Sequence, residues 1–451
     1  METAKIGNAL SHYYGDVRRA MRSLAASKPE AGEFFEPAWE IPELSESLER
    51  YFSASGLSGG SMGEYHGRRL LFMNLTGNPR THTTKTFGSQ VIVARALRHI
   101  ETHDEPVLLV TPSAANKAVA LRDAVLRAYE AGLATPETLR VTAIVPYSSL
   151  IKLWDSPLAT DPALAAANPL GVYRGAERED VKRLLTAAYR TVADEIRAAT
   201  GFRAWYTLDP DNYKAADVVR ASFEREFFAP GERTRWHAHA VSSAYGFLGH
   251  NLGTQLSGGE PQGAANPAKY LLVQHLETPD LVMAVTGRQE LPAYERDAAT
   301  GLLRQPEPAD PRFPAVCYST NERLERTFYT RLPPTTPAVT ELLRRQGGDG
   351  IVVSLPECLQ RYQEVRGLLA SAGMTRLPED PRKLREWAMV MAVVGSLTAI
   401  DRGILPEDVD VLVHGSGAYS EGEFESPDRS VLHEVTTAQD VAEVLLAAAK
   451  A

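Results

Sequence analysis

The hydrophobic and polar positions of the chain follow two patterns in turn. Short runs in which nearly every residue is apolar, such as 105–113 and 139–148, indicate buried strands. Longer segments with apolar residues every three or four positions, such as 115–132 and 179–201, indicate amphipathic helices that end at a glycine. Since strands that alternate with helices favour a parallel sheet, we expect an α/β architecture.

The same alternation continues on both sides of this region. Further strands are predicted at 68–77, 202–208 and 409–417, and further helices at 85–99, 380–403 and 437–450. Two more apolar segments, 270–276 and 281–287, extend the pattern. The glycine- and serine-rich stretch 53–67 predicts a flexible loop, either an active-site lid or a connector.

Composition and charge narrow the class of protein. The 451 residues are 44% hydrophobic and 23% charged, which is ordinary for a globular chain of two or three structural units. A formal charge of −9 without a basic stripe argues against nucleic acid as a partner. No run reaches the ~18 apolar residues of a membrane span, and the first residues lack the apolar core of a signal peptide.

The two cysteines give a further indication of the compartment. Cys317 and Cys358 form neither a disulfide framework nor a metal-binding pattern. A reducing compartment fits this usage best. We therefore expect a cytoplasmic protein that acts on small molecules, without a membrane or nucleic-acid partner.

Lys85 stands at the start of the predicted helix 85–99, directly after the stretch "GNPRTHTT". A lysine forms a Schiff base only when its amine is neutral and held in a partly dry pocket. The start of a buried helix supplies such a place, and the positive end of the helix dipole disfavours the protonated amine. The neighbouring hydroxyls of Thr83, Thr84 and Thr86 are candidates to bind a phosphate. A solvated surface lysine is the alternative interpretation.

The segment "TPSAANKAVA", residues 111–120, turns from a strand end into a helix. Small residues before a helix let backbone N–H groups converge on an anion. The Asn116 side chain can bond a phenolic oxygen or a carboxylate. The alternative is a plain helix cap made by Ser113 or Asn116.

Two later segments have the same strand-to-turn character. In "HAVSSAYGFLGHN", residues 239–251, the side chains and amides of Ser242, Ser243 and Gly246 predict a phosphate cradle, the alternative being an ordinary turn before a helix. In 411–423 a strand ends in His-Gly-Ser-Gly, whose glycines permit a flat ligand to approach the backbone. There His414 or Ser416 would face the ligand, whereas the alternative is a tight turn with an exposed histidine.

A pair of histidines, His237 and His239, has the spacing of one strand face. A metal site requires a third ligand, and the sequence alone places none beside them. We therefore interpret both side chains as structural or pocket-lining and predict no metal.

In their order and spacing, these segments resemble the fold-type II family of pyridoxal phosphate (PLP) enzymes, which includes tryptophan synthase β, threonine synthase and cysteine synthase. The match extends from about residue 70 to about residue 420 and is nearest to threonine synthase and cysteate synthase. The resemblance implies a two-lobed α/β fold of mostly parallel twisted sheets flanked by helices, with PLP between the lobes, and a homodimer. It divides the chain into an N-terminal helical extension (1–60), a large cofactor-binding domain (61–94 and 211–451) and a small mobile domain (95–210).

The resemblance also implies a role for each matching residue. "GNPRTHTTK" is similar to the family's Schiff-base stretch, which makes Lys85 the catalytic lysine with Thr84 beside the cofactor. "PSAAN" is similar to the turn that binds the substrate carboxylate, formed here by Ser113, Ala114, Ala115 and Asn116, and Asn116 also holds the 3′-oxygen of the cofactor. The phosphate loop corresponds to Ser242, Ser243, Tyr245 and Gly246, and the site of the pyridine nitrogen to His414, Gly415 and Ser416.

Three positions depart from the family pattern. Ala115 stands where glycine is usual, so its methyl group narrows the room for a substrate. His414 stands where the family has serine or threonine, which tunes the electron sink differently. Val110 lies near the place where tryptophan synthase β has an acidic residue, so we do not expect indole chemistry.

The function implied is that of a PLP-dependent lyase or synthase. Its substrate would be an amino acid with an O-phosphorylated or O-acylated side chain, and Lys85 would act as general base in β- or γ-elimination or replacement. A PLP-fold binding protein without turnover is the alternative, motivated by Ala115 and His414. A doubly wound nucleotide-binding oxidoreductase is disfavoured because no clear G-x-G-x-x-G follows the first strand.

Overall fold

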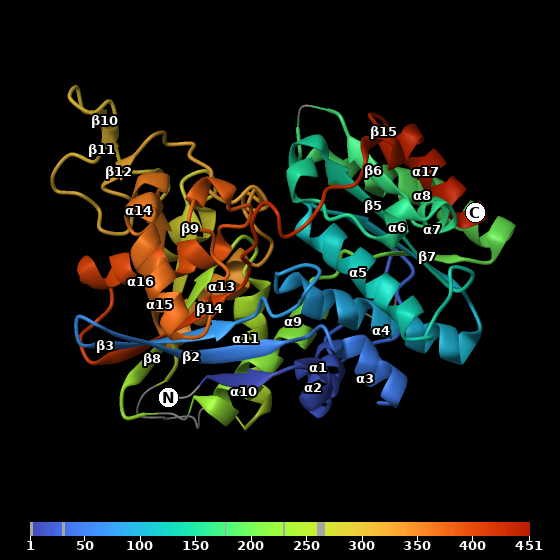
Figure 1. Ribbon diagram of the computed structural model, residues 1–451, viewed down its shortest axis with the longest axis horizontal. Coiled ribbons are helices and arrows are strands. Elements are labelled where there is room, and N and C mark those ends of the chain that lie inside the picture. Colours follow the sequence, from blue (N-terminus) through green and yellow to red (C-terminus); the bar gives the residue numbers. More distant parts are fainter. Residues whose placement is uncertain (1–2, 29–31, 176, 229–230, 259–266) are drawn as a thin grey trace. The chain divides into compact units, whose positions relative to one another are not determined.

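The chain forms two compact units in a computed structural model that describes residues 3–28, 32–175, 177–228, 231–258 and 267–451 (Figure 1). Unit 1 contains residues 1–6, 56–77 and 223–421. Unit 2 contains residues 7–55, 78–222 and 422–451. The helix α10 (Val219–Phe227) includes the boundary at residues 222 and 223.

Unit 1 is built on a seven-stranded sheet in the order β1-β2-β3-β14-β8-β9-β13. The five strands from β3 to β13 are parallel, while β1 and β2 pair antiparallel at one edge. The strands are β1 (Ala4–Ile6), β2 (Leu57–Tyr65), β3 (Arg68–Asn74), β8 (Thr234–Ala240), β9 (Lys269–His275), β13 (Gly348–Val353) and β14 (Val409–Gly415).

Helices cover both faces of this sheet. Alternate strand residues such as Phe72, Ala238 and Val413 join the core made with α15 (Tyr362–Ser371) and α16 (Ala388–Asp401). Residues of the opposite parity, such as Tyr270 and Val352, pack with α11 (Tyr245–Leu256), α12 (Asp280–Thr286) and α13 (Thr336–Gln346). The remaining elements are α14 (Leu355–Gln360), η2 (Pro381–Lys383), and the small antiparallel sheet of β10 (Glu295–Arg296), β11 (Leu303–Arg304) and β12 (Val316–Cys317).

The predicted flexible loop at 53–67 is wrong, because most of it forms the strand β2. The glycines of this strand allow close packing instead of flexibility. A β-carbon at Gly59 would lie 2.6 Å from the Phe228 ring and 2.7 Å from the carbonyl oxygen of Phe72. Glycine therefore stands here because its neighbours leave no room for a side chain.

Unit 2 is built on a five-stranded, fully parallel sheet in the order β15-β6-β5-β4-β7. Leu108 and Val110 of β4 face the core made with α8 (Asp180–Thr200) and α17 (Ala438–Lys450). Ala143 and Val145 of β5 face the core that includes α5 (Asn116–Glu130). The strands are β4 (Val107–Pro112), β5 (Leu139–Pro146), β6 (Leu170–Tyr173), β7 (Arg203–Tyr206) and β15 (Leu432–Val435).

The other elements of unit 2 are mainly helical. They are α1 (Ala9–His12), α2 (Tyr14–Ala25), α3 (Glu46–Phe52), α4 (Lys85–His103), α5 (Asn116–Glu130), η1 (Tyr147–Lys152), α6 (Pro157–Thr160), α7 (Pro162–Ala167), α8 (Asp180–Thr200), α9 (Asp211–Asp217), η3 (Arg429–Val431) and α17 (Ala438–Lys450).

The predicted α/β architecture with mostly parallel sheets is confirmed. The apolar segment 270–276 corresponds to strand β9, and the segment 281–287 to helix α12. The predicted small mobile domain, residues 95–210, lies within unit 2, and its movement stays a prediction. Within the described part of the chain, every helix is too short or too polar to cross a bilayer.

Candidate active site

Lys85 is the first residue of α4, and its side chain is half-buried. Asn78 shapes the loop that leads into this helix. The Asn78 side chain accepts a hydrogen bond of 3.0 Å from the Thr83 backbone N–H and donates one of 2.9 Å to the Thr83 carbonyl oxygen. Both ends of the asparagine amide are thus used to fix the turn, which sets the point where the helix and its lysine begin.

An aromatic ring lies beside the Lys85 amine. The Lys85 Nζ atom is 4.7 Å from the centroid of the Tyr213 ring, which α9 supplies. Gly88 makes room for this ring, because a β-carbon there would lie 2.3 Å from a ring carbon of Tyr213. Cation–π contact of this kind holds an amine in place in a partly desolvated setting. Sequence reasoning missed both Gly88 and Tyr213.

The threonine hydroxyls around Lys85 are used differently from one another. Thr84 accepts a hydrogen bond of 2.8 Å from Arg220 and lies 3.3 Å from an Asp217 oxygen, so it belongs to the buried ion pair of these two residues. The Thr86 hydroxyl bonds that of Thr81. The Thr83 hydroxyl is buried and has no hydrogen-bond partner among the described residues. Of the three hydroxyls proposed for phosphate, Thr83 is therefore the one with an unused polar atom.

The turn before α5 is organised by Ser113. Its Oγ atom accepts hydrogen bonds from the backbone N–H of Ala115 (3.1 Å) and of Ala118 (2.9 Å). Ser113 thus performs the capping role that the sequence left open as an alternative. Asn116 follows as the first residue of the helix, and its side chain is buried.

Ala115 has a backbone conformation that suits glycine. Its φ angle is 144° and its ψ angle is −61°, a combination that side-chain-bearing residues rarely adopt. The family pattern has glycine at this position, and the backbone explains why. The alanine methyl is fully buried. The departure noted in the sequence is therefore a strained residue at the candidate substrate turn.

Lys117 is a second lysine at this place, and the sequence reasoning did not single it out. Burial, with the nearby charge of Lys85 as a smaller cause, lowers the pKa of the Lys117 ammonium to about 7. Its Nζ donates a hydrogen bond to the Thr207 carbonyl oxygen. An amine with such a pKa is partly neutral at neutral pH, and two lysines share this end of unit 2. The signal for it in the sequence is a lysine that comes directly after a turn of small residues.

The candidate phosphate turn lies in unit 1 at the carboxyl end of β8. Ser242 and Ser243 follow the strand, and the helix α11 begins at Tyr245. Ala244, which precedes this helix, has a left-handed φ of 56° and lacks a side chain able to cap it. The first N–H groups of α11 therefore face the turn uncapped by that residue, an arrangement that suits an anion.

His414 and Gly415 end the strand β14, which pairs parallel with β8. Both candidate segments of unit 1 therefore lie at the carboxyl ends of neighbouring strands. Parallel α/β sheets bind ligands at the carboxyl ends of their strands. The alternative of an exposed His414 is wrong, because the side chain is fully buried. Gly415 is required by packing, since a β-carbon there would lie 2.6 Å from the Phe72 ring.

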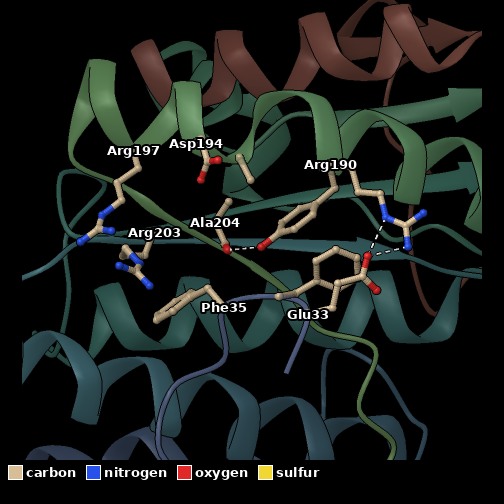
Figure 2. A pocket seen from close by; sticks show the side chains of 10 residues that line it. Glu33, Phe35, Arg190, Asp194, Arg197, Arg203 and Ala204 are labelled. Carbon is tan, nitrogen blue, oxygen red and sulfur yellow. Dashed lines mark hydrogen bonds and ion pairs between the residues drawn. The ribbon is translucent and has the colours of Figure 1, made fainter. Parts of the chain in front are cut away.

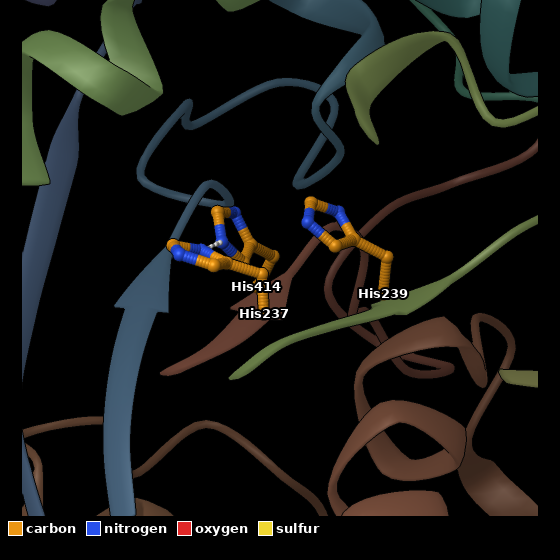
Figure 3. A group of neighbouring side chains, drawn as sticks. All are labelled: His237, His239 and His414. Carbon is orange, nitrogen blue, oxygen red and sulfur yellow. Dashed lines mark hydrogen bonds between the residues drawn. The ribbon is translucent and has the colours of Figure 1, made fainter. Parts of the chain in front are cut away.

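Three histidines gather on the face of this sheet that carries α11. His237 and His239 of β8 share that face, as expected, and His414 of β14 joins them (Figure 3). Their nearest nitrogen atoms lie within 4.8 Å of one another. A second group, Glu224, His237 and His250, meets the same limit. The structure thus supplies the third partner that the sequence did not place.

A pocket in unit 2 is lined by other residues than these (Figure 2). Phe35, Arg190, Arg197 and Arg203 are among its lining residues. Its arginines already face carboxylates: Arg190 lies 2.6 Å from Glu33, and Arg197 lies 3.2 Å from Glu105. None of the candidate site residues lines this pocket.

Comparison with known proteins places the chain in a family. The family model "Family of unknown function (DUF6002)" matches residues 5–449. The chain belongs to the DUF6002 family. No curated protein sequence matches it.

Solved structures resemble the chain more broadly. PLP-bound threonine synthase from Brucella melitensis matches with a TM-score of 0.53 and 10% identity, over 97% of this chain and 85% of that one. The O-acetylserine-dependent cystathionine beta-synthase from Helicobacter pylori has a TM-score of 0.47 and 14% identity (85% and 97% covered), and a fungal L-serine ammonia-lyase from Rhizomucor miehei has 0.47 and 12% (78% and 90% covered). At 10% identity, the likeness to threonine synthase shows the fold alone. The predicted fold-type II architecture is confirmed.

Proposed function

We propose that this chain is a PLP-dependent enzyme in which Lys85 forms the Schiff base with the cofactor. The observation that carries the proposal is the setting of Lys85, a half-buried amine at a helix start, held against Tyr213, with the desolvated Lys117 nearby. A solvated surface lysine has water around its amine instead of these contacts. The fold-type II architecture supports the same role.

The residues present fit most of what the cofactor requires. An anionic phosphate requires N–H donors, and the turn of Ser242, Ser243 and Gly246 at the start of α11 supplies them. Tyr245 stands in the same turn. The fold-type II enzymes have a neutral hydroxyl at the pyridine nitrogen. Here His414 occupies that position and is followed by Gly415 and Ser416. The fit is therefore good at the amine and the phosphate and different at the ring nitrogen.

Each residue of the chain then has a defined task. When bound, PLP supplies an electron sink for the α-carbon of an amino acid. The Lys85 amine takes and returns the proton at that carbon. Asn116, at the first turn of α5, orients the substrate carboxylate with the backbone of Ala114 and Ala115, while Ser113 holds the turn in shape. Thr84 keeps α4 in place through Asp217 and Arg220.

We further propose that the substrate is an amino acid whose side-chain hydroxyl is phosphorylated or acylated, and that it undergoes β- or γ-elimination or replacement. The support is the likeness of the ordered segments to threonine synthase and cysteate synthase. Release of ammonia and a 2-oxo acid, measured with a panel of serine and homoserine esters, tests elimination. Adding thiols or sulfite as nucleophiles tests replacement. A homodimer is proposed on the same likeness and is tested by light scattering.

A second candidate is a PLP-binding protein without turnover. The strained methyl of Ala115 and the buried His414 favour it, since both occupy positions where the family has smaller or hydroxyl-bearing residues. A chain that binds PLP and releases no product from any ester would support this alternative. Restored turnover in Ala115→Gly would then point to the methyl group as the cause.

The cofactor test is spectroscopic. Purified chain is mixed with PLP, the visible absorbance of the Schiff base is recorded, and the adduct is reduced with borohydride and mapped by mass spectrometry. We expect the label on Lys85, loss of the absorbance in Lys85→Ala, and retention in Lys182→Ala, which changes an exposed lysine of α8. A label on Lys117, or a colourless mixture, would refute the assignment.

A further inference from the structure

A buried polar cluster in unit 1 includes His414, the residue at the candidate ring-nitrogen position. It consists of His237 and His239 on β8, His414 on β14, His250 on α11 and Glu224 on α10. The four histidines are almost completely buried. A group of imidazoles in such a place requires partners, because each ring has two polar nitrogens.

The cluster forms a chain of close contacts. His237 Nδ1 lies 3.1 Å from His414 Nε2, and Figure 3 shows these rings side by side. His237 Nε2 lies 3.6 Å from Glu224 Oε1. The other oxygen of Glu224 lies 2.7 Å from His250 Nε2, and His250 Nδ1 lies 3.2 Å from the Tyr270 hydroxyl.

Glu224 is the charged end of this chain. Burial raises the pKa of its carboxyl, but the neighbouring His237, His250 and Arg235 outweigh burial and hold that pKa well below its usual range. Arg235 lies 2.6 Å from the carboxylate. Burial lowers the pKa of His237 to about 3, so that ring is neutral at physiological pH. A neutral histidine carries one N–H, and its position must follow from the neighbours.

The carboxylate decides which nitrogen carries that proton. The negative charge beside His237 Nε2 favours the N–H on that nitrogen. His237 Nδ1 is then an acceptor, so the 3.1 Å contact requires His414 to donate from Nε2. A neutral His414 that carries its proton on Nε2 has Nδ1 as an acceptor. The charge of Glu224 therefore decides which nitrogens of His237 and His414 donate and which accept.

Metal binding explains the same cluster less well. The rings of His239 and His414 are stacked, with centroids 3.9 Å apart and planes 21° apart. Lone pairs of imidazole nitrogens lie in the ring plane, so those of two stacked rings lie in separate, nearly parallel planes and do not converge on one ion. In the second group, the Arg235 guanidinium already neutralises Glu224. Both features favour a row of polar contacts in which the Glu224 carboxylate acts on His237 Nε2 by its charge at 3.6 Å.

We propose that Glu224 and His237 are positioning residues that keep Nδ1 of His414 an acceptor, and that this nitrogen accepts a hydrogen bond from a protonated pyridine nitrogen of PLP. The second part rests on the proposed function. The neutral hydroxyl of the fold-type II enzymes would leave that nitrogen unprotonated. An acceptor that is oriented by a carboxylate favours the protonated ring. A protonated ring withdraws electrons more strongly from the substrate α-carbon.

The first experiment uses the full chain without PLP. Nitrogen-15 NMR of labelled histidines reports which ring nitrogen carries the proton. We expect His237 and His414 both neutral at pH 7 with the proton on Nε2. In Glu224→Gln the preference should weaken at both rings, while Glu226→Gln, an exposed glutamate on the same helix, should leave it unchanged. A proton on Nδ1 of His414, a charged His237, or stoichiometric zinc in the purified chain would overturn the proposal.

The second experiment adds PLP labelled with nitrogen-15 in its ring. We expect a protonated ring nitrogen in the wild type, and a shift to the unprotonated signal in His414→Ser. Glu224→Gln should move the signal in the same direction and serves if His414→Ser does not fold. An unprotonated nitrogen in the wild type would overturn the role toward the ring. A chain that binds no PLP would refute the proposed function and this role, while the histidine tautomers still decide the chain of Glu224, His237 and His414.

Discussion

The Tyr213 ring packs directly on Gly88 in the first turn of α4, three residues after Lys85. A β-carbon at Gly88 would lie 2.3 Å from the ring, so no larger residue fits without moving Tyr213. The same ring faces the Lys85 amine at 4.7 Å. The position of the lysine and the absence of a side chain at residue 88 are therefore linked.

Gly88→Ala should destabilise unit 2 by about 1–3 kcal/mol, because overpacking displaces a buried ring. Urea unfolding measures the change. Gly367→Ala in α15 is the matched control, since a β-carbon there meets nothing within 4 Å. That substitution should stabilise the chain by about 0.5–1 kcal/mol. Equal effects of the two substitutions would contradict the packing argument.

Ala115→Gly should relieve backbone strain at the turn before α5. A side-chain-bearing residue at a φ of 144° carries a cost of about 1–3 kcal/mol, which glycine avoids. Glycine makes the unfolded chain more flexible, which offsets part of the gain, so we expect a net stabilisation of about 1 kcal/mol. Thermal unfolding of Ala115→Gly and of Ala114→Gly tests this. Residue 114 has no positive φ, so its substitution should destabilise.

Lys117 should make the stability of the chain depend on alkaline pH. Burial and the charge of Lys85 lower its pKa to about 7 in the folded chain, while an unfolded lysine titrates near ~10.4. Between these values the unfolded state binds more protons, so stability should rise with pH, by at most about 1.4 kcal/mol per pH unit. Urea unfolding at several alkaline pH values should show this rise in the wild type and in Lys182→Met. It should be absent in Lys117→Met.

His237 and Glu224 should make the chain sensitive to acid. An unfolded histidine takes up a proton near pH ~6.5, but His237 does so only near a pKa of about 3, so stability falls as the pH decreases between these values. The lowered pKa of Glu224 acts in the same direction, since its stabilisation is lost as the pH falls below the unfolded value. The decline should be shallower in His237→Asn and unchanged in His66→Asn, an exposed histidine. Parallel curves for all three chains would disprove the assignment.

The sequence predicted those parts of the fold that depend on local pattern. The apolar runs of β4 and β5 and the periodic helices α5 and α8 were found where they were expected. β2 was missed because its glycines, which the structure requires for close packing, read as a flexible segment. Glycine is common both in flexible segments and where chain segments pack closely, so composition alone does not distinguish the two.

The candidate site divides in the same way. Lys85 and Asn116 were noticed because each stands at a predicted strand–helix junction within a stretch of characteristic residues. Gly88, Tyr213 and Glu224 were not, because their importance comes from neighbours far away in the chain. Tyr213 reaches Lys85 across more than a hundred residues, and no local periodicity reports such a contact.

The composition of unit 2 has a consequence for biosynthesis. The edge strand β15 and the helix α17 that packs beside α8 come from residues 422–451, which follow all of unit 1 in the sequence. On the ribosome, one apolar side of α8 and one edge of β6 therefore stay uncovered until residues 422–451 have been made. Chaperones that shield such surfaces should bind the growing polypeptide and dissociate once residues 422–451 emerge.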